Sequence, residues 1–330
     1  GTTLTLGTSG DTVVVPSGVN LAPGGGLTLT GALAVDGGTV KLDGPFPTGT
    51  QNTALGNDAL ASGSLSGGYN TAIGDTALKT NTSGAANVAV GRDALELNTT
   101  GCQNTALGQN VMYTNVSGDF NTAVGREALY SNTTADNNTA LGNSAMKLNT
   151  TGTCNTAVGN DALFSNTTGA SNTAVGYKAL APNTTGAQNT AVGFGSLCLN
   201  ITGCRNTSMG YNSLAVNTTG ICNVSIGRST LDANTTGDFN TAVGNSALSG
   251  NTTADNNTAV GHLSLNANTT GTRNTAIGTL ALDANTTADD NTAGGYESLG
   301  ANTTGHSNTA FGKSSLKANT TASDNTSFGF

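Results

Sequence analysis

The sequence has few of the residues that usually build a globular core or an active site. It contains no Trp, 6 Tyr, 8 Phe and 2 His, and 9% of its 330 residues are charged. His262 and His306 pair with no Cys, Ser or carboxylate at a recurring spacing, whereas catalysis needs such groups held in a defined cluster. The sequence therefore predicts a protein that is not an enzyme and that holds no cofactor or metal.

Basic residues and long apolar runs are also scarce. There are 11 Lys and Arg against 19 Asp and Glu, which gives a net charge of −8. Phosphate binding needs clusters of basic side chains, and none occurs here. No apolar stretch approaches the roughly twenty residues that cross a bilayer, and no signal peptide is recognisable. We therefore expect no nucleic-acid partner and no membrane insertion.

The cysteines and acidic residues follow no metal-ligand pattern. The five cysteines form no C-x-x-C pair, so free thiols are the first interpretation and a Cys204–Cys222 disulfide is the alternative. Adjacent carboxylates such as Asp289 and Asp290 could bind a divalent cation between chains, but a solvated surface is the simpler interpretation.

What the sequence does contain is a seventeen-residue repeat. Its clearest copy, NTAVGNDALFSNTTGAS, runs from Asn155 (position 1) to Ser171 (position 17). Residues 52–330 comprise sixteen full copies, the first one residue longer, and a partial copy at 325–330. Such a period is typical of a solenoid in which each repeat packs on its neighbours. Residues 1–51 carry short β-branched runs and predict a separate β-rich adaptor or linker. Because the chain begins at Gly1 and stops within a repeat, we expect it to be part of a longer protein.

Two apolar positions recur in the repeat. Position 4 is apolar in every copy except at Gly294, and position 9 is always Leu or Met. A helix would find at most about six suitable residues between the Asn, Thr and Gly clusters. We therefore predict an all-β parallel solenoid with two short strands per coil and a turn at the position-5 Gly. The predicted structural core ladder is Val90, Leu95, Leu107, Met112, Val124, Leu129, Leu141, Met146, Val158, Leu163, Val175, Leu180, Val192 and Leu197.

The first of the two strands predicted in each coil carries no charged residue on either face. Side chains alternate between the two faces of a strand, so one face can fill the narrow coil while the face with position 4 needs a partner. The simplest partner is another copy of the same chain. Charges gather instead at positions 6, 7, 10, 16 and 17, which we expect to face solvent.

Positions 12–15 read Asn-Thr-Thr-Gly or a close variant. We predict a stacked turn ladder in which Asn side chains bond to neighbouring backbone. Its members include Asn98, Asn115, Asn132, Asn149, Asn166 and Asn183. The same residues form N-x-S/T sequons, so glycosylation is the alternative.

The units NTAVG, NTAIG, NVAVG and NVSIG resemble the head repeats of YadA-like trimeric autotransporter adhesins. The longer form NTAVGxxALxxNTTGxx is similar to repeats of bacteriophage tail fibres, and TTLTLGTSGDTVVVPSGVNL resembles linker strands of such fibres, notably in phages of marine cyanobacteria. This resemblance implies a homotrimer of left-handed parallel β-rolls. The repeat is longer than in the adhesin heads, which favours the phage fibre.

The expected function is therefore that of a structural tail-fibre shaft on the virion, outside the cell, which spaces or presents host-receptor binding. Expected partners are two further copies, other tail or baseplate proteins, and a host surface glycan or protein. Three alternatives remain: an adhesin head, an ice-binding solenoid suggested by Thr at positions 2, 13 and 14, and a sugar-binding shaft. The last would use outward aromatic residues, namely Tyr113, Tyr130, Phe164, Tyr177, Phe194, Tyr211 and Tyr296.

Overall fold

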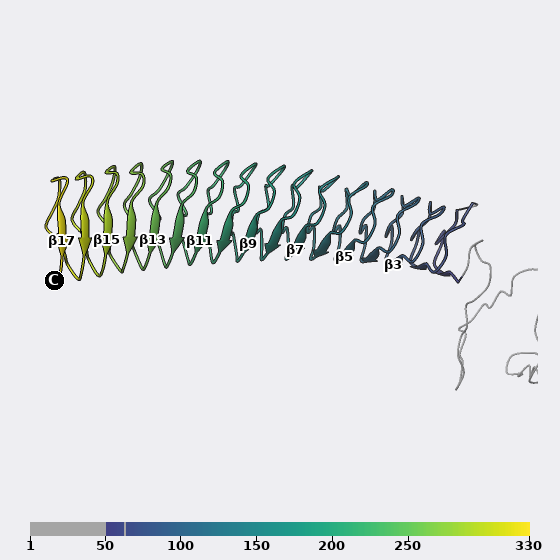
Figure 1. Ribbon diagram of the computed structural model, residues 1–330. Helices are drawn as coiled ribbons and strands as arrows, with labels where there is room; N and C mark the ends of the chain where they lie inside the picture. Colours follow the sequence, from purple (N-terminus) through teal and green to yellow (C-terminus); the bar gives the residue numbers. More distant parts are fainter. Residues whose placement is uncertain (1–50, 63) are drawn as a thin grey trace, which may run out of the picture. The chain divides into compact units, whose positions relative to one another are not determined.

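The computed structural model describes residues 51–62 and 64–330, which form one β-solenoid (Figure 1). Each coil contributes one strand of three residues at positions 2–4. The strands are β1 (Thr53–Leu55), β2 (Thr71–Ile73), β3 (Val88–Val90), β4 (Thr105–Leu107), β5 (Thr122–Val124), β6 (Thr139–Leu141), β7 (Thr156–Val158), β8 (Thr173–Val175), β9 (Thr190–Val192), β10 (Thr207–Met209), β11 (Val224–Ile226), β12 (Thr241–Val243), β13 (Thr258–Val260), β14 (Thr275–Ile277), β15 (Thr292–Gly294), β16 (Thr309–Phe311) and β17 (Thr326–Phe328). The predicted adaptor at 1–51 lies outside the described residues, apart from Gln51.

Consecutive strands pair in parallel and in register. Thr156 of β7 lies opposite Thr173 of β8, and Val158 lies opposite Val175. Every strand pairs with the equivalent strand of the next coil, so the seventeen strands form a single sheet along the solenoid. The prediction of an all-β parallel solenoid with one seventeen-residue repeat per coil is confirmed, and none of the described residues is helical.

The coil closes through four positions with positive φ. In the coil that begins at Asn155 these are Gly159, Asp161, Leu163 and Ser171, with φ of 135°, 54°, 53° and 59°. At the first of them glycine is required, because a Cβ would lie 2.5 Å from the carbonyl oxygen of Gly176 in the next coil. Position 5 therefore turns the chain out of the strand, as expected.

The second strand expected around position 9 is absent from the described coils, and this prediction was wrong. Position 9 lies in a turn, with φ between 47° and 53° in every coil, and a left-handed backbone cannot continue a strand. The backbone N–H of Leu163 still donates to the carbonyl of Ala179 at 3.0 Å, so bonding between coils continues through the turn.

The core is narrow and runs the length of the solenoid. Small side chains at positions 3 and 8 and the Leu or Met at position 9 fill it, as Ala157, Ala162 and Leu163 do with no exposed area. In several coils hydroxyl groups replace one or both of the core alanines and form hydrogen bonds there. Ser208 Oγ, for example, donates to the carbonyl of Ser213 at 2.7 Å. The interior of each coil is therefore filled by side chains.

Candidate functional site

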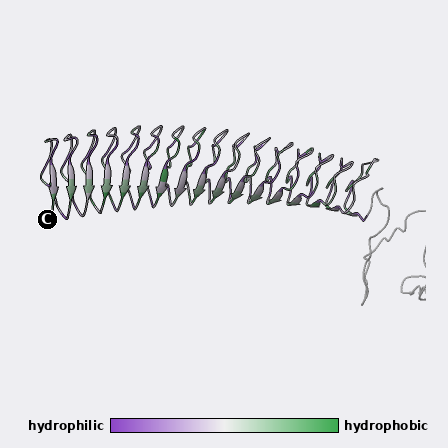
Figure 2. Ribbon diagram, in the orientation of Figure 1, coloured by the Kyte–Doolittle hydropathy of each residue, from purple (hydrophilic) through white to green (hydrophobic). Residues whose placement is uncertain are grey.

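The outward face of the sheet carries a continuous apolar stripe, formed by the position-4 residues of β1 to β17. Along a strand, positions 3 and 4 point to opposite faces, so Ala157 is buried while position 4 faces outward. Leu55 is 59% exposed, Ile277 51% and Leu107 36%. In Figure 2 the hydrophobic colour recurs on strand after strand.

The predicted core ladder therefore separates into two sets. Its position-9 members lie inside the coil: Leu95, Met112, Leu129, Met146, Leu163, Leu180 and Leu197. Its position-4 members are surface residues of the single chain: Val90, Leu107, Val124, Leu141, Val158, Val175 and Val192. These side chains join a core only when another molecule covers the sheet.

The stripe is large and uncharged. Eleven of its seventeen residues are at least 36% exposed, and a contiguous exposed apolar row of this length is unusual on a monomer. Position 2 beside it is Thr in every described strand except those that begin at Val88 and Val224. At the one gap, Gly294, the ring of Phe311 covers the place of the missing side chain. The stripe therefore stays unbroken along the whole sheet.

The position-12 asparagines form a buried ladder. Asn166 Nδ2 donates to Asn149 Oδ1 at 2.7 Å and to the carbonyl of Gly169 at 2.9 Å. The same pair of bonds recurs in the other predicted members, Asn98, Asn115, Asn132, Asn149 and Asn183, all fully buried. Because these amides are enclosed and bonded, the folded coil leaves no room for a glycan on them.

Charged side chains lie on the outside and bridge neighbouring coils. Lys147 Nζ lies 2.7 Å from Glu127 Oε2, and this hydrogen bond holds the pKa of Glu127 below its usual range. Arg273 bonds to Asp290 at 2.7 Å and lowers its pKa in the same way. Asp289 and Asp290 thus face an arginine, and no group of three metal-ligating side chains occurs in the described residues.

The five cysteines, Cys102, Cys154, Cys198, Cys204 and Cys222, are all free thiols, so the alternative of a Cys204–Cys222 disulfide is not realised. The coils that contain Cys204 and Cys222 are joined by a backbone hydrogen bond instead, in which the Cys222 N–H donates to the carbonyl of Cys204 at 3.0 Å. Cys198 is partly enclosed, and this burial raises the pKa of its thiol.

Several outward aromatic residues stack along the solenoid. Tyr177, Phe194 and Tyr211 occupy position 6 of three consecutive coils, with ring centroids 5.2 and 5.4 Å apart. Tyr113 and Tyr130 stack in the same way at position 10. Stacked rings cover one another's faces and present mainly their edges to solvent. This arrangement is unsuited to sugars, which pack on an open ring face.

Comparisons with protein-family models, with curated protein sequences and with solved structures found no match for this chain. Within the described residues, no helix has the length and hydropathy of a membrane span.

Proposed function

We propose that this chain is a structural, non-enzymatic shaft segment of a bacteriophage tail fibre, assembled as a homotrimer on the virion. The observation that carries the proposal is the apolar stripe, which runs unbroken over all seventeen strands and carries no charge. A stripe of this size on a soluble protein is typical of an interaction surface. Other tail or baseplate proteins would hold the shaft, and a host surface glycan or protein would be reached through it.

The repeat period favours a second copy of the same chain as the partner. The stripe presents one apolar side chain per coil, at the spacing of paired strands, about 4.8 Å. A surface with the same axial spacing can place one apolar side chain against every member of the stripe, and another copy of the chain has that spacing. Three copies around one axis would enclose all three stripes, in keeping with the resemblance to trimeric fibres.

Light scattering on the purified chain, with negative-stain images, tests the proposal. We expect three times the mass of one chain and a thin rod, in which sixteen coils span roughly 75–80 Å. A single-chain mass at all concentrations would contradict the proposal, because the stripe would then be stable in water without a partner.

An ice-binding solenoid is the second candidate. The supporting observation is the row of Thr side chains at position 2, such as Thr156 and Thr173, which share the outward face with the stripe. This face is uncharged and regular, and its threonine hydroxyls make no hydrogen bond within the described part of the chain. Thermal hysteresis in a solution of single chains would support ice binding in place of the fibre.

A further inference from the structure

Most of the apolar stripe looks alike from one coil to the next. From β1 to β14 its position-4 residue is Leu, Ile, Val or Met, so each coil presents one aliphatic side chain of similar size. A second copy displaced along the stripe by one coil, about 4.8 Å, would again meet aliphatic side chains in nearly every coil. Burial of the aliphatic residues alone therefore does not fix the axial register of the copies.

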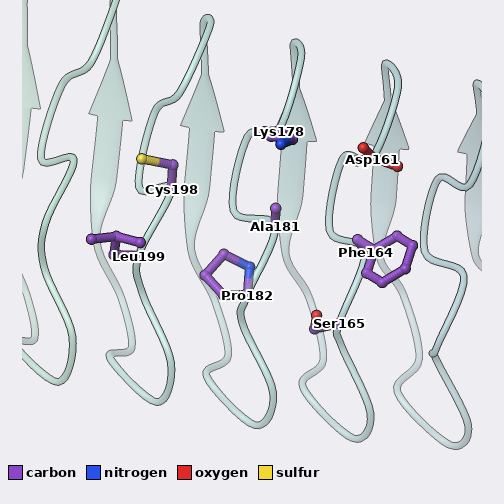
Figure 3. A pocket seen from close by; sticks show the side chains of 8 residues that line it. All are labelled: Asp161, Phe164, Ser165, Lys178, Ala181, Pro182, Cys198 and Leu199. Carbon is purple, nitrogen blue, oxygen red and sulfur yellow. The ribbon is translucent and has the colours of Figure 1, made fainter.

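A feature that fixes this register must break the repeat on the face that the copies share. A groove of about 330 Å³ breaks the repeat over three consecutive coils (Figure 3). Its lining residues, which include Asp161, Phe164, Ala181 and Cys198, lie at positions 7, 10 and 11. None of these positions belongs to the stripe, so the groove does not align copies that pack through the sheet.

The stripe itself changes at β15, β16 and β17, where position 4 holds Gly294, Phe311 and Phe328. The Phe311 ring leans over Gly294, because a Cβ on that glycine would overlap its Cδ1. The Phe311 and Phe328 rings are stacked, with centroids 5.7 Å apart and an angle of 5° between their planes. They are 43% and 72% exposed. We call these three residues the aromatic end of the stripe.

The aromatic end packs best against its own copy. In level copies the Phe311 rings lie in one layer and the Phe328 rings in the next, where they can form aromatic pairs between chains. In a copy displaced by two coils, Phe311 would instead face Ile277, and its ring would be wider than the space left by the smaller side chains. Ring packing therefore favours level copies, whereas the aliphatic part of the stripe is nearly indifferent.

We propose that the aromatic end fixes the axial register of the copies, so that they assemble parallel and level with one another. This inference rests on the proposed homotrimer and adds the residues that determine how its chains align. Gly294 contributes by leaving the space over the strand that the Phe311 ring occupies.

Disulfide trapping in the full chain measures this register. The reporter chain carries Val158→Cys and Val192→Cys, two coils apart in the stripe, and mild oxidation links thiols that face one another across the interface. Level copies give 158–158 and 192–192 links, and copies displaced by two coils give 158–192 links. Within one chain these positions lie about 9.6 Å apart, too far for a disulfide. Peptide mapping separates the links from any that the five native thiols form.

The test variant adds Gly294→Val, Phe311→Val and Phe328→Val to the reporter, so that the whole stripe is aliphatic. It is expected to fold, because these residues lie on the outward face and the ring that would overlap a side chain at 294 is gone; an unchanged melting temperature verifies this. We expect equal-position links alone in the reporter and at least a fivefold rise of 158–192 links in the test variant.

The matched control makes three changes in the aliphatic part of the stripe, Leu107→Val, Leu141→Val and Met209→Val, and should keep the link pattern of the reporter. Light scattering on the same samples distinguishes the two proposals. Chains that remain single contradict the homotrimer and the register with it. If the reporter assembles but forms 158–192 links or no 158–158 links, or if the assembled test variant forms equal-position links alone, the register proposal is overturned and the homotrimer stands.

Discussion

The backbone at position 9 restricts which side chain can fill the core. All sixteen residues there have φ between 47° and 53°, a left-handed conformation in which β-branched side chains are strongly disfavoured. The position holds only Leu and Met, whereas position 4, which lies in an extended strand, also accepts Val and Ile. Conformation at one residue, as well as hydrophobicity, therefore selects the core side chain.

Replacing Leu163 tests this restriction. Leu163→Ile keeps the side-chain volume but adds a branch at Cβ, so we expect the free energy of unfolding to fall by about 2–4 kcal/mol. Leu163→Met is the control and should cost less than about 1.5 kcal/mol, since Met146 occupies the same position in the preceding coil. Chemical denaturation compares the two; equal costs would show that the left-handed backbone does not select the side chain.

The buried Asn ladder should tolerate no change of charge. In Asn166→Asp the donor to Asn149 Oδ1 and to the Gly169 carbonyl is lost, and an anion would face both oxygens. We expect a loss of about 3 kcal/mol or more at neutral pH, measured by denaturation. Asn160→Asp makes the same chemical change at an exposed position and should alter stability little; a similar loss in both variants would contradict the role of the ladder.

The burial of Asp232 makes the stability of the folded chain depend on pH, and the direction of this dependence follows from the shift in its pKa. Burial raises its pKa above the ordinary 3.8, so the folded chain holds this proton more tightly than the unfolded chain does. Its contribution to stability is therefore present below about pH 3.8 and is lost as pH rises through the folded value. Asp232→Asn should raise the melting temperature at pH 7, and the gain should vanish in acid.

Asp290→Asn is the control, and its effect on the melting temperature should have the opposite sign, because Arg273 lowers the pKa of Asp290. This variant should lower the melting temperature at neutral pH, and its loss should fade as pH falls. Parallel pH profiles for the two variants would contradict both assignments.

At the scale of the coil, the sequence was sufficient to predict the period, the parallel stacking and the outward apolar face. It failed at position 9, where apolar periodicity was interpreted as a second strand. The exclusion of Val and Ile from that position was the signal that could have indicated a turn. The predicted register already places Phe164, Ala181 and Cys198 side by side, but the groove that they line could not be predicted, because it depends on the turn at positions 7–11, which the sequence pattern presented as a strand.

The coil should behave as a unit that can be removed whole. Deleting residues 155–171 joins Cys154 to Asn172 and lets β6 stack on β8 in register. Deleting only 155–163 removes fewer residues but leaves eight that cannot complete a coil. We expect the larger deletion to cost less stability, measured by circular dichroism melting. A smaller loss from the shorter deletion would show that the coil is not the folding unit.

At the scale of the whole molecule, the outward stripe should control assembly without controlling folding. Val158, Val175 and Val192 already contact solvent in the single chain, so replacing all three with Lys should leave the coil folded. We expect the triple variant to have the mass of one chain in light scattering, because the buried interface would hold unpaired charges.

The matched control places three lysines at position 14, by Thr168→Lys, Thr185→Lys and Thr202→Lys. These residues are exposed and lie outside the stripe. The control should keep the mass of the parent protein. If both variants lost assembly, the added charge in general would be the cause. If the variant with three lysines in the stripe still assembled, the interface would lie elsewhere on the chain.

The backbone bonds between coils run along the row of strands, so each coil is held only by its two neighbours (Figure 1). A pull on the two ends of a single solenoid would therefore strain the bonds of one terminal coil at a time. Each coil that peels away would release seventeen residues, roughly 50 Å of slack. A single chain under tension would lengthen in equal steps at modest force, because one terminal coil detaches at a time. Copies packed side by side would divide the applied force among their chains. The assembled protein would therefore resist stretching better than a single chain.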